Sequence, residues 1–150
     1  MKKLEIKDNI LIIDDGQKCW NADLGAIDIA CTDGFVINLK FSNGKQAFLH
    51  PENKQSREEF NALVELLTQH SNFYQCDGYM VINLENLQEL TLQEEKNSWG
   101  YYDLDMRFRR MKGGLASKDL EKQKQTMEDI LQAKQNYDEM INNTIEGHLC

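Results

Sequence analysis

Four short turn signals divide the first eighty residues of this 150-residue chain into brief segments. Asp and Asn tolerate a positive φ and Gly adopts one without steric cost, so Asp-Gly and Asn-Gly pairs mark tight turns between antiparallel strands. The segments between these turns are rich in β-forming residues. We therefore expect a largely antiparallel sheet over residues 4–92. The four pairs are Asp15-Gly16, Asp33-Gly34, Asn43-Gly44 and Asp77-Gly78.

The clearest hairpin surrounds Asn43-Gly44. Large apolar residues stand at every second position from residue 35 to residue 41. A two-residue turn would pair Phe41 with Gln46 and Leu39 with Phe48. This register predicts one apolar face formed by Phe35, Ile37, Leu39, Phe41 and Phe48.

Two helices are predicted from apolar spacing and capping residues. Ser56 and Glu59 have the spacing of a capping box, and apolar residues at helical intervals follow them, which predicts a helix over residues 57–70. Ser117 can cap a long C-terminal helix over residues 117–145. Its apolar stripe is continuous from Met127 onward and thin before it. Such a helix either packs its second half on its own sheet or projects toward a partner.

These elements predict the α+β class in one domain, since 150 residues is the length of a single ordinary domain. We expect a β-rich core with one helix over residues 1–92. Residues 93–116 are expected to form an aromatic and basic connector. Residues 117–150 are expected to form the C-terminal helix, packed on or projecting from the same domain.

Charge is distributed unevenly along the chain. The formal net charge is −8, which argues against a polyanion covering the whole surface. Residues 51–100 carry three bases and nine acids, a net of −6, and residues 125–150 carry one base and five acids, a net of −4. Residues 107–124 carry seven bases and two acids, a net of +5. The sequence therefore predicts an acidic protein with one local basic stretch.

No segment has the features of a secretion signal or a membrane helix. The longest apolar runs are four residues, whereas a membrane-spanning helix needs about 20. The cysteines at 19, 31, 76 and 150 contain no CxxC spacing, so we expect reduced thiols. We expect a cytoplasmic protein that does not contact a membrane.

The search for catalytic and metal-binding motifs is negative. The sequence has no phosphate-binding loop, no dinucleotide fingerprint, no HExxH and no GxSxG. His50, His70 and His148 lack the local spacing of a zinc site. We expect no cofactor, no metal and no catalytic residue. A Cys–His pair assembled in space is left open, and so is an enzyme of an unfamiliar type.

One segment mixes aromatic and basic side chains in the way that binding surfaces do. Arginines pair bidentately with phosphate or carboxylate, and aromatic rings stack on bases or fill protein interfaces. We expect a partner to bind at this segment. The candidate residues are Trp99, Tyr101, Tyr102, Arg107, Phe108, Arg109, Arg110 and Lys112.

Two functions follow from these features. The main hypothesis is a small acidic protein-binding module, acting as an inhibitor, immunity or adaptor protein through charge and shape complementarity. The alternative is a nucleic-acid-associated regulator that uses the basic aromatic segment 99–124. A homodimer formed through the C-terminal helix is left open. No motif is specific enough to assign a family.

Overall fold

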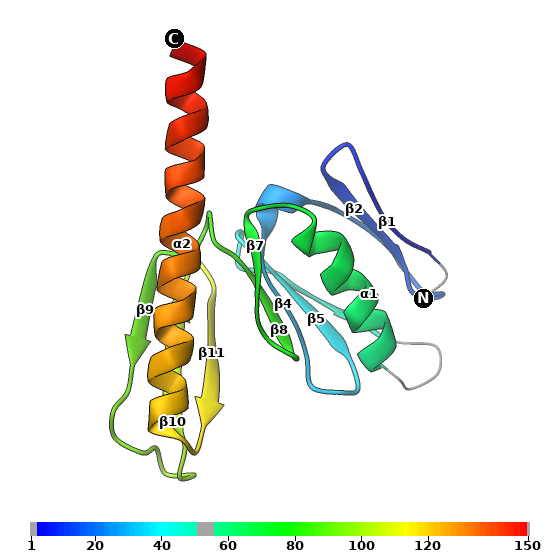
Figure 1. The fold of residues 1–150 in the computed structure, drawn as a ribbon. Helices are drawn as coiled ribbons and strands as arrows, with labels where there is room; N and C mark the ends of the chain where they lie inside the picture. Colours follow the sequence, from blue (N-terminus) through cyan, green and yellow to red (C-terminus); the bar gives the residue numbers. More distant parts are fainter. Residues whose placement is uncertain (1–2, 51–55, 150) are drawn as a thin grey trace.

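The computed structural model describes residues 3–50 and 56–149 and contains three antiparallel sheets and two α-helices (Figure 1). The sheets have the strand orders β1-β2-β3, β6-β5-β4-β8-β7 and β11-β10-β9. The helices are α1 (Ser56–Thr68) and α2 (Leu120–Leu149), and a short 3₁₀ helix, η1, spans Leu24–Ala26. The strands are β1 (Lys3–Lys7), β2 (Ile10–Asp14), β3 (Cys19–Asp23), β4 (Ile27–Thr32), β5 (Ile37–Phe41), β6 (Gln46–Leu49), β7 (Phe73–Asp77), β8 (Met80–Asn83), β9 (Glu89–Leu92), β10 (Tyr102–Arg107) and β11 (Lys112–Ser117).

The predicted α+β class is confirmed, and the predicted helix over 57–70 matches α1 closely. The side chain of Ser56, expected to cap that helix, lies outside the described side chains. The sheet region extends to Ser117, whereas we expected it to end near residue 92. Residues 93–116, expected to be a connector, contain β10 and most of β11. The alternation of buried Leu104 and Met106 with the charged residues beside them makes β10 a strand with one solvated face.

Two hydrophobic cores lie on opposite faces of the five-stranded sheet. The first joins α1, β2 and the inner side chains of β5 and β6, including Phe60, Leu63, Leu39 and Ile13. The second joins β4 and β8 to α2 and the β9–β11 sheet, including Ile29, Ile82, Leu104, Phe108 and Ile130. Each fully buried side chain of this size contributes about 1.5–3 kcal/mol of stability.

An irregularity in β4 allows that strand to serve both cores. Ile27 pairs with Phe41 and Ile29 pairs with Lys40, so the register shifts at Asp28. Residues two apart on a strand normally share a face, but a bulge between them reverses this. Ile27 therefore packs in the first core and Ile29 packs in the second.

The hairpin of β5 and β6 differs from our prediction by one residue in its register. Leu39 pairs with Ala47, and Phe48 pairs with Asn38. The Phe41 N–H donates to the Lys45 carbonyl, and Gly44 has a φ of 87°, so the loop holds three residues rather than two. A slip of one residue moves every side chain of the second strand to the other face. Phe48 is consequently 51% exposed, and Phe35, which precedes β5, is 75% exposed.

Helix α2 crosses the β9–β11 sheet with its first half and continues beyond it (Figure 1). It begins at Leu120 rather than at the expected Ser117, which ends β11, and the Asp119 carboxylate accepts the Lys122 N–H at 3.2 Å. The buried Gln123 amide donates to the carbonyls of Tyr102 and Leu115, each at 2.8 Å, and fixes the helix to β10 and β11. None of the helices in the described part of the chain has the length and apolar character needed to span a membrane.

Candidate functional site

The residues predicted to form one binding segment lie at two opposite ends of β10. Trp99, Tyr101 and Tyr102 stand where β10 begins, and the arginines and Lys112 stand where it ends and β11 starts. Six residues of strand separate the two ends by about 17 Å at 3.3 Å per residue. Arg107, Arg109, Arg110 and Lys112 are brought together by the turn between β10 and β11, but the aromatic residues are not brought to them.

Phe108 lies inside the molecule. Its side chain is 1% exposed and packs in the second core beside Met106 and Met111. Its N–H donates to the Met111 carbonyl at 2.9 Å and closes the turn that carries Arg109 and Arg110. Phe108 therefore anchors this turn, and its ring is not part of the surface.

We call the surface formed by Lys40, Lys45, Arg109, Arg110 and Lys112 the basic end. The Lys40 Nζ donates to the Lys112 carbonyl at 3.3 Å, which joins β5 to β11. A Cβ placed on Gly44 would lie 3.8 Å from the Cβ of Arg110, so the β5–β6 turn meets the β10–β11 turn. Among the described residues, no carboxylate lies within ion-pair distance of any of these five cations.

Lys40 and Lys45 were not among the residues predicted from the sequence. They precede the other basic residues of this surface by more than sixty positions. They also lie outside the basic stretch that we identified from the net charge of residues 107–124. The only local signal is that they flank the Asn43-Gly44 turn. Their place beside Arg110 depends on the packing of two sheets, which sequence spacing does not contain.

We call the surface formed by Lys96, Trp99, Tyr101, Tyr102 and Lys118 the aromatic end. The Lys96 Nζ lies 5.8 Å from the centre of the Tyr102 ring, and the Lys118 Nζ lies 5.5 Å from that of Tyr101. Trp99 is 83% exposed. Glu94 and Glu121 both pair with Lys124, on α2 near this end. The aromatic end therefore has mixed charge.

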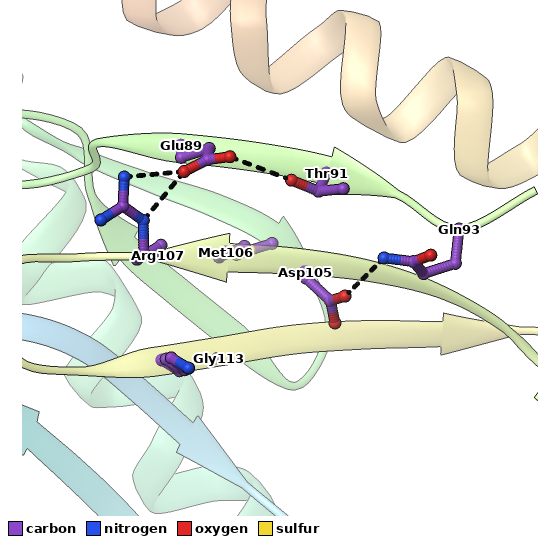
Figure 2. A pocket seen from close by; sticks show the side chains of 8 residues that line it. Glu89, Thr91, Gln93, Asp105, Met106, Arg107 and Gly113 are labelled. Atoms are coloured by element: carbon purple, nitrogen blue, oxygen red, sulfur yellow. Dashed lines mark hydrogen bonds and ion pairs between the residues drawn. The ribbon is translucent and has the colours of Figure 1, made fainter.

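The solvated face of the β9–β11 sheet holds a shallow cavity of about 380 Å³ (Figure 2). Its polar side chains bind one another across the strands. Arg107 donates from Nη2 to Glu89 Oε2 at 2.7 Å and from Nε at 2.9 Å, and Gln93 donates to Asp105 at 3.2 Å. These pairs satisfy one another, as on an ordinary solvated sheet face, and leave Arg107 neutralised.

A second cavity, of about 400 Å³, is a groove between β11 and the face of the five-stranded sheet that carries the second core. Val36, Asn38, Phe48 and Tyr79 line the sheet side, and Gly114 to Ala116 line the other. Lys40 stands in its wall and also belongs to the basic end, so the groove is continuous with that surface. We call this cavity the inter-sheet groove.

Two aspartates are buried with opposite consequences for their pKa. Burial alone would raise the pKa of Asp15. Its carboxylate accepts hydrogen bonds from the backbone N–H groups of Lys18, Gln17 and His50, and these bonds lower the pKa overall. Burial raises the pKa of Asp28, which the Asn86 amide only partly offsets at 3.0 Å. Oδ2 of Asp28 has no hydrogen-bond partner among the described residues.

Two of the described thiols lie in surroundings that disfavour their ionisation. Burial raises the pKa of Cys31, and it raises that of Cys76 to about 12, so neither thiol forms a thiolate readily at neutral pH. No group of three or more metal-ligating side chains is present among the described residues. His148, whose zinc spacing was assessed from the sequence, and Cys150 lie outside the described side chains.

No protein-family model and no curated protein matches the chain. Among solved structures, the LytTr DNA-binding domain of a methyl-accepting/DNA response regulator from Bacillus cereus is similar at a TM-score of 0.45 and 7% identity. The match covers 81% of this chain and 98% of that one.

Our main functional hypothesis, an inhibitor, immunity or adaptor protein that docks on another protein, is corrected by this finding. The similar structure is described as a DNA-binding domain, whereas the main hypothesis named a protein partner. At this similarity we transfer neither residues nor activity from it. Support for the alternative comes from the side chains of this chain.

Proposed function

We propose that this protein is a nucleic-acid-associated regulator whose basic end binds the phosphate backbone. The observation that carries the proposal is the convergence of five cations from two hairpins, with no carboxylate pairing with them among the described residues. Lys and Arg supply most of the affinity of proteins for nucleic acid, because they displace condensed counterions from phosphates. It acts by binding rather than by catalysis, and we place it in the cytoplasm.

The overall charge of −8 is compatible with a local contact of this kind. Charges separated by more than about 8–10 Å are largely screened at physiological salt. Acidic residues elsewhere on the molecule therefore weaken phosphate binding at the basic end less than their number suggests. They also disfavour contact with a polyanion outside that end, which confines the nucleic acid to one part of the surface.

The rigidity of the basic end supports the same function. The β10–β11 turn is anchored by the buried Phe108, and Lys40 is held against β11 by its bond to the Lys112 carbonyl. Arg109 and Arg110 are exposed on this anchored turn, and a guanidinium can donate two parallel bonds to one phosphate. Cations placed on fixed turns lose less freedom on binding than cations on a flexible tail.

Fluorescence anisotropy with labelled oligonucleotides tests the proposal. Binding should weaken steeply between about 50 mM and about 200 mM salt, with a log–log slope of about −0.7 to −0.9 per phosphate neutralised. The double variant Arg109→Ala/Arg110→Ala should lose affinity and reduce the magnitude of that slope. The matched control Lys96→Ala/Lys118→Ala removes the same charge at the aromatic end and should change neither.

Two results would overturn the proposal. One is the absence of binding to both single-stranded and duplex probes at low salt. The other is an equal loss of affinity in the double variant and in its control, which would mean that only the net charge matters.

A further inference from the structure

The inter-sheet groove has features of a base-binding site that phosphate contacts alone do not require. The groove has a volume of about 400 Å³ and opens beside the basic end. Pockets that hold small planar ligands have volumes of this order, roughly 300–1,000 Å³. Gly114 and Ala116 line one wall, and the small size of these residues keeps the groove open on the β11 side.

Two exposed aromatic rings line the groove. Phe48 is 51% exposed and Tyr79 is 53% exposed, and both stand on the sheet side of the groove. The guanidinium of Arg57 lies 4.4 Å from the centre of the Tyr79 ring, and its Nη1 donates to the Gly78 carbonyl at 2.6 Å. Exposed rings beside cations are the combination that stacks the bases of single strands.

A buried polar atom in the groove also lacks a partner. The Asn38 amide donates from Nδ2 to Gln46 Oε1 at 3.1 Å, but its Oδ1 is buried and accepts no hydrogen bond from a described residue. A buried acceptor without a partner is unfavourable, so a ligand donor that reached it would be bound favourably. The amino groups of cytosine and adenine are donors of this kind.

Charge orients the ligand within the groove. Lys40 stands at the end that opens onto the basic end, whereas Asp33 and Asp77 also line the cavity. The carboxylate of Asp33 accepts the N–H groups of Phe35 and Val36, and these bonds lower its pKa, so it is charged at neutral pH. A phosphate is therefore attracted to the Lys40 side and repelled from the aspartates.

We propose that the inter-sheet groove receives an unpaired base of a single-stranded nucleic acid whose phosphates lie on the basic end. The proposal rests on the proposed function and names its ligand class. A base in a duplex is stacked and paired, so it cannot enter the groove without leaving the helix. The groove thus selects single strands, and Asn38 favours bases that carry an amino group.

Anisotropy measurements on matched probes test the groove separately from the basic end. The probes are a labelled strand of cytosine and adenine of about 12 nucleotides, and the same strand in a duplex. The wild-type protein should bind the single strand about tenfold more tightly. Phe48→Thr, which keeps β-propensity but removes the ring, should abolish most of that preference and leave duplex binding unchanged.

Phe35→Thr is the matched control, because Phe35 is 75% exposed but does not line the groove. It should bind both probes as the wild type does. Asn38→Ala should remove the preference for this strand over an all-thymine strand. Circular dichroism and a thermal unfolding curve establish that each variant is folded.

Chemical labelling of the thiols gives a second readout. Cys31 lines the groove, and Cys19 is exposed on β3. The bound single strand should slow alkylation of Cys31 and leave Cys19 unchanged, as measured by peptide mass spectrometry.

Equal binding of both probes by the wild type, with no effect of Phe48→Thr, would overturn the groove proposal and leave the proposed function standing. A tighter single-strand complex that neither protects Cys31 nor responds to Phe48→Thr would also overturn it. Failure of the proposed function itself would appear differently, as a loss of binding to both probes.

Discussion

The two ends of β10 both carry cations, five at the basic end and two at the aromatic end, and they differ in what surrounds those cations. At the basic end, Lys40 and Lys45 from one sheet meet Arg109, Arg110 and Lys112 from another, and no carboxylate of the described residues pairs with them. At the aromatic end, Lys96 and Lys118 lie over tyrosine rings, and the neighbouring Lys124 pairs with Glu94. The difference teaches that cations gathered from two sheets, without carboxylates paired to them, distinguish a candidate phosphate-binding surface from an ordinary solvated one.

The largest expected effect comes from breaking the packing that holds the basic end to the five-stranded sheet. A methyl group at Gly113 would overlap the Cδ1 atom of Ile29, which is fully buried. Gly113→Ala should lower the free energy of unfolding by about 1–3 kcal/mol, because a packed core tolerates little extra volume. Chemical denaturation measures this change.

Gly25→Ala is the control for that substitution. A Cβ at Gly25 would lie 3.7 Å from the Asp23 carboxylate, which is ordinary contact. Its stability should stay within about 0.5 kcal/mol of the wild type. Equal stability of the two variants would mean that β11 is not packed on Ile29 as described.

The next effect tests whether the basic end is built from two hairpins. Lys45→Glu reverses a charge that is far from Arg110 in sequence but next to Gly44, whose turn meets Arg110 in the fold. We expect a loss of about 1 kcal/mol in nucleic-acid binding, which is about fivefold in affinity. Lys7→Glu makes the same charge change on β1 and should leave the affinity unchanged. An unaffected Lys45→Glu would reduce the site to the β10–β11 turn alone.

A smaller effect concerns the buried carboxyl of Asp28 in β4. Because burial raises the folded-state pKa of Asp28, the folded protein holds this proton more tightly than the unfolded chain does. The stability contributed by Asp28 is complete below the unfolded pKa and is lost as pH rises through the folded pKa.

Asp28→Asn removes that dependence while keeping an acceptor for the Asn86 amide. Relative to the wild type, the variant should be more stable at about pH 7 than at about pH 4, by denaturant midpoints at each pH. A difference in stability between the variant and the wild type that does not change with pH would contradict the raised pKa of Asp28.

The smallest effect is expected at the aromatic end. Trp99 is 83% exposed and makes only a backbone hydrogen bond, to the Asn97 side chain, among the described contacts. Trp99→Ser should change stability by less than about 0.5 kcal/mol and nucleic-acid affinity by less than about twofold. A large loss of affinity in this variant would return the binding site to the segment first identified from the sequence.

Local patterns predicted the elements of the fold that depend on local interactions. Helix α1 was identified because Phe60, Leu63 and Leu67 form a stripe that packs in the first core. The β5–β6 hairpin was predicted correctly, but its register was not. The loop from Ser42 to Gly44 has three residues instead of the expected two, and this one-residue difference turns Phe48 outward. The alternation in β10 was present in the sequence and was obscured by its charged residues.

The candidate site was predictable only in part. Arg109, Arg110 and Lys112 were identified from their density along the chain. Lys40 and Lys45 were not, because their position depends on how two sheets pack across Ile29 and Gly113. The β10–β11 hairpin also separates the basic stretch 107–124 into two groups, which no count along the sequence distinguishes.

Cross-linking tests the location of the binding site most directly. A photoreactive single-stranded oligonucleotide is irradiated with the full chain, and the attached peptides are mapped by mass spectrometry. We expect cross-links on residues 36–48 of the β5–β6 hairpin and on residues 107–116 of the β10–β11 hairpin. Cross-links concentrated on residues 94–102 or on α2 would contradict this location.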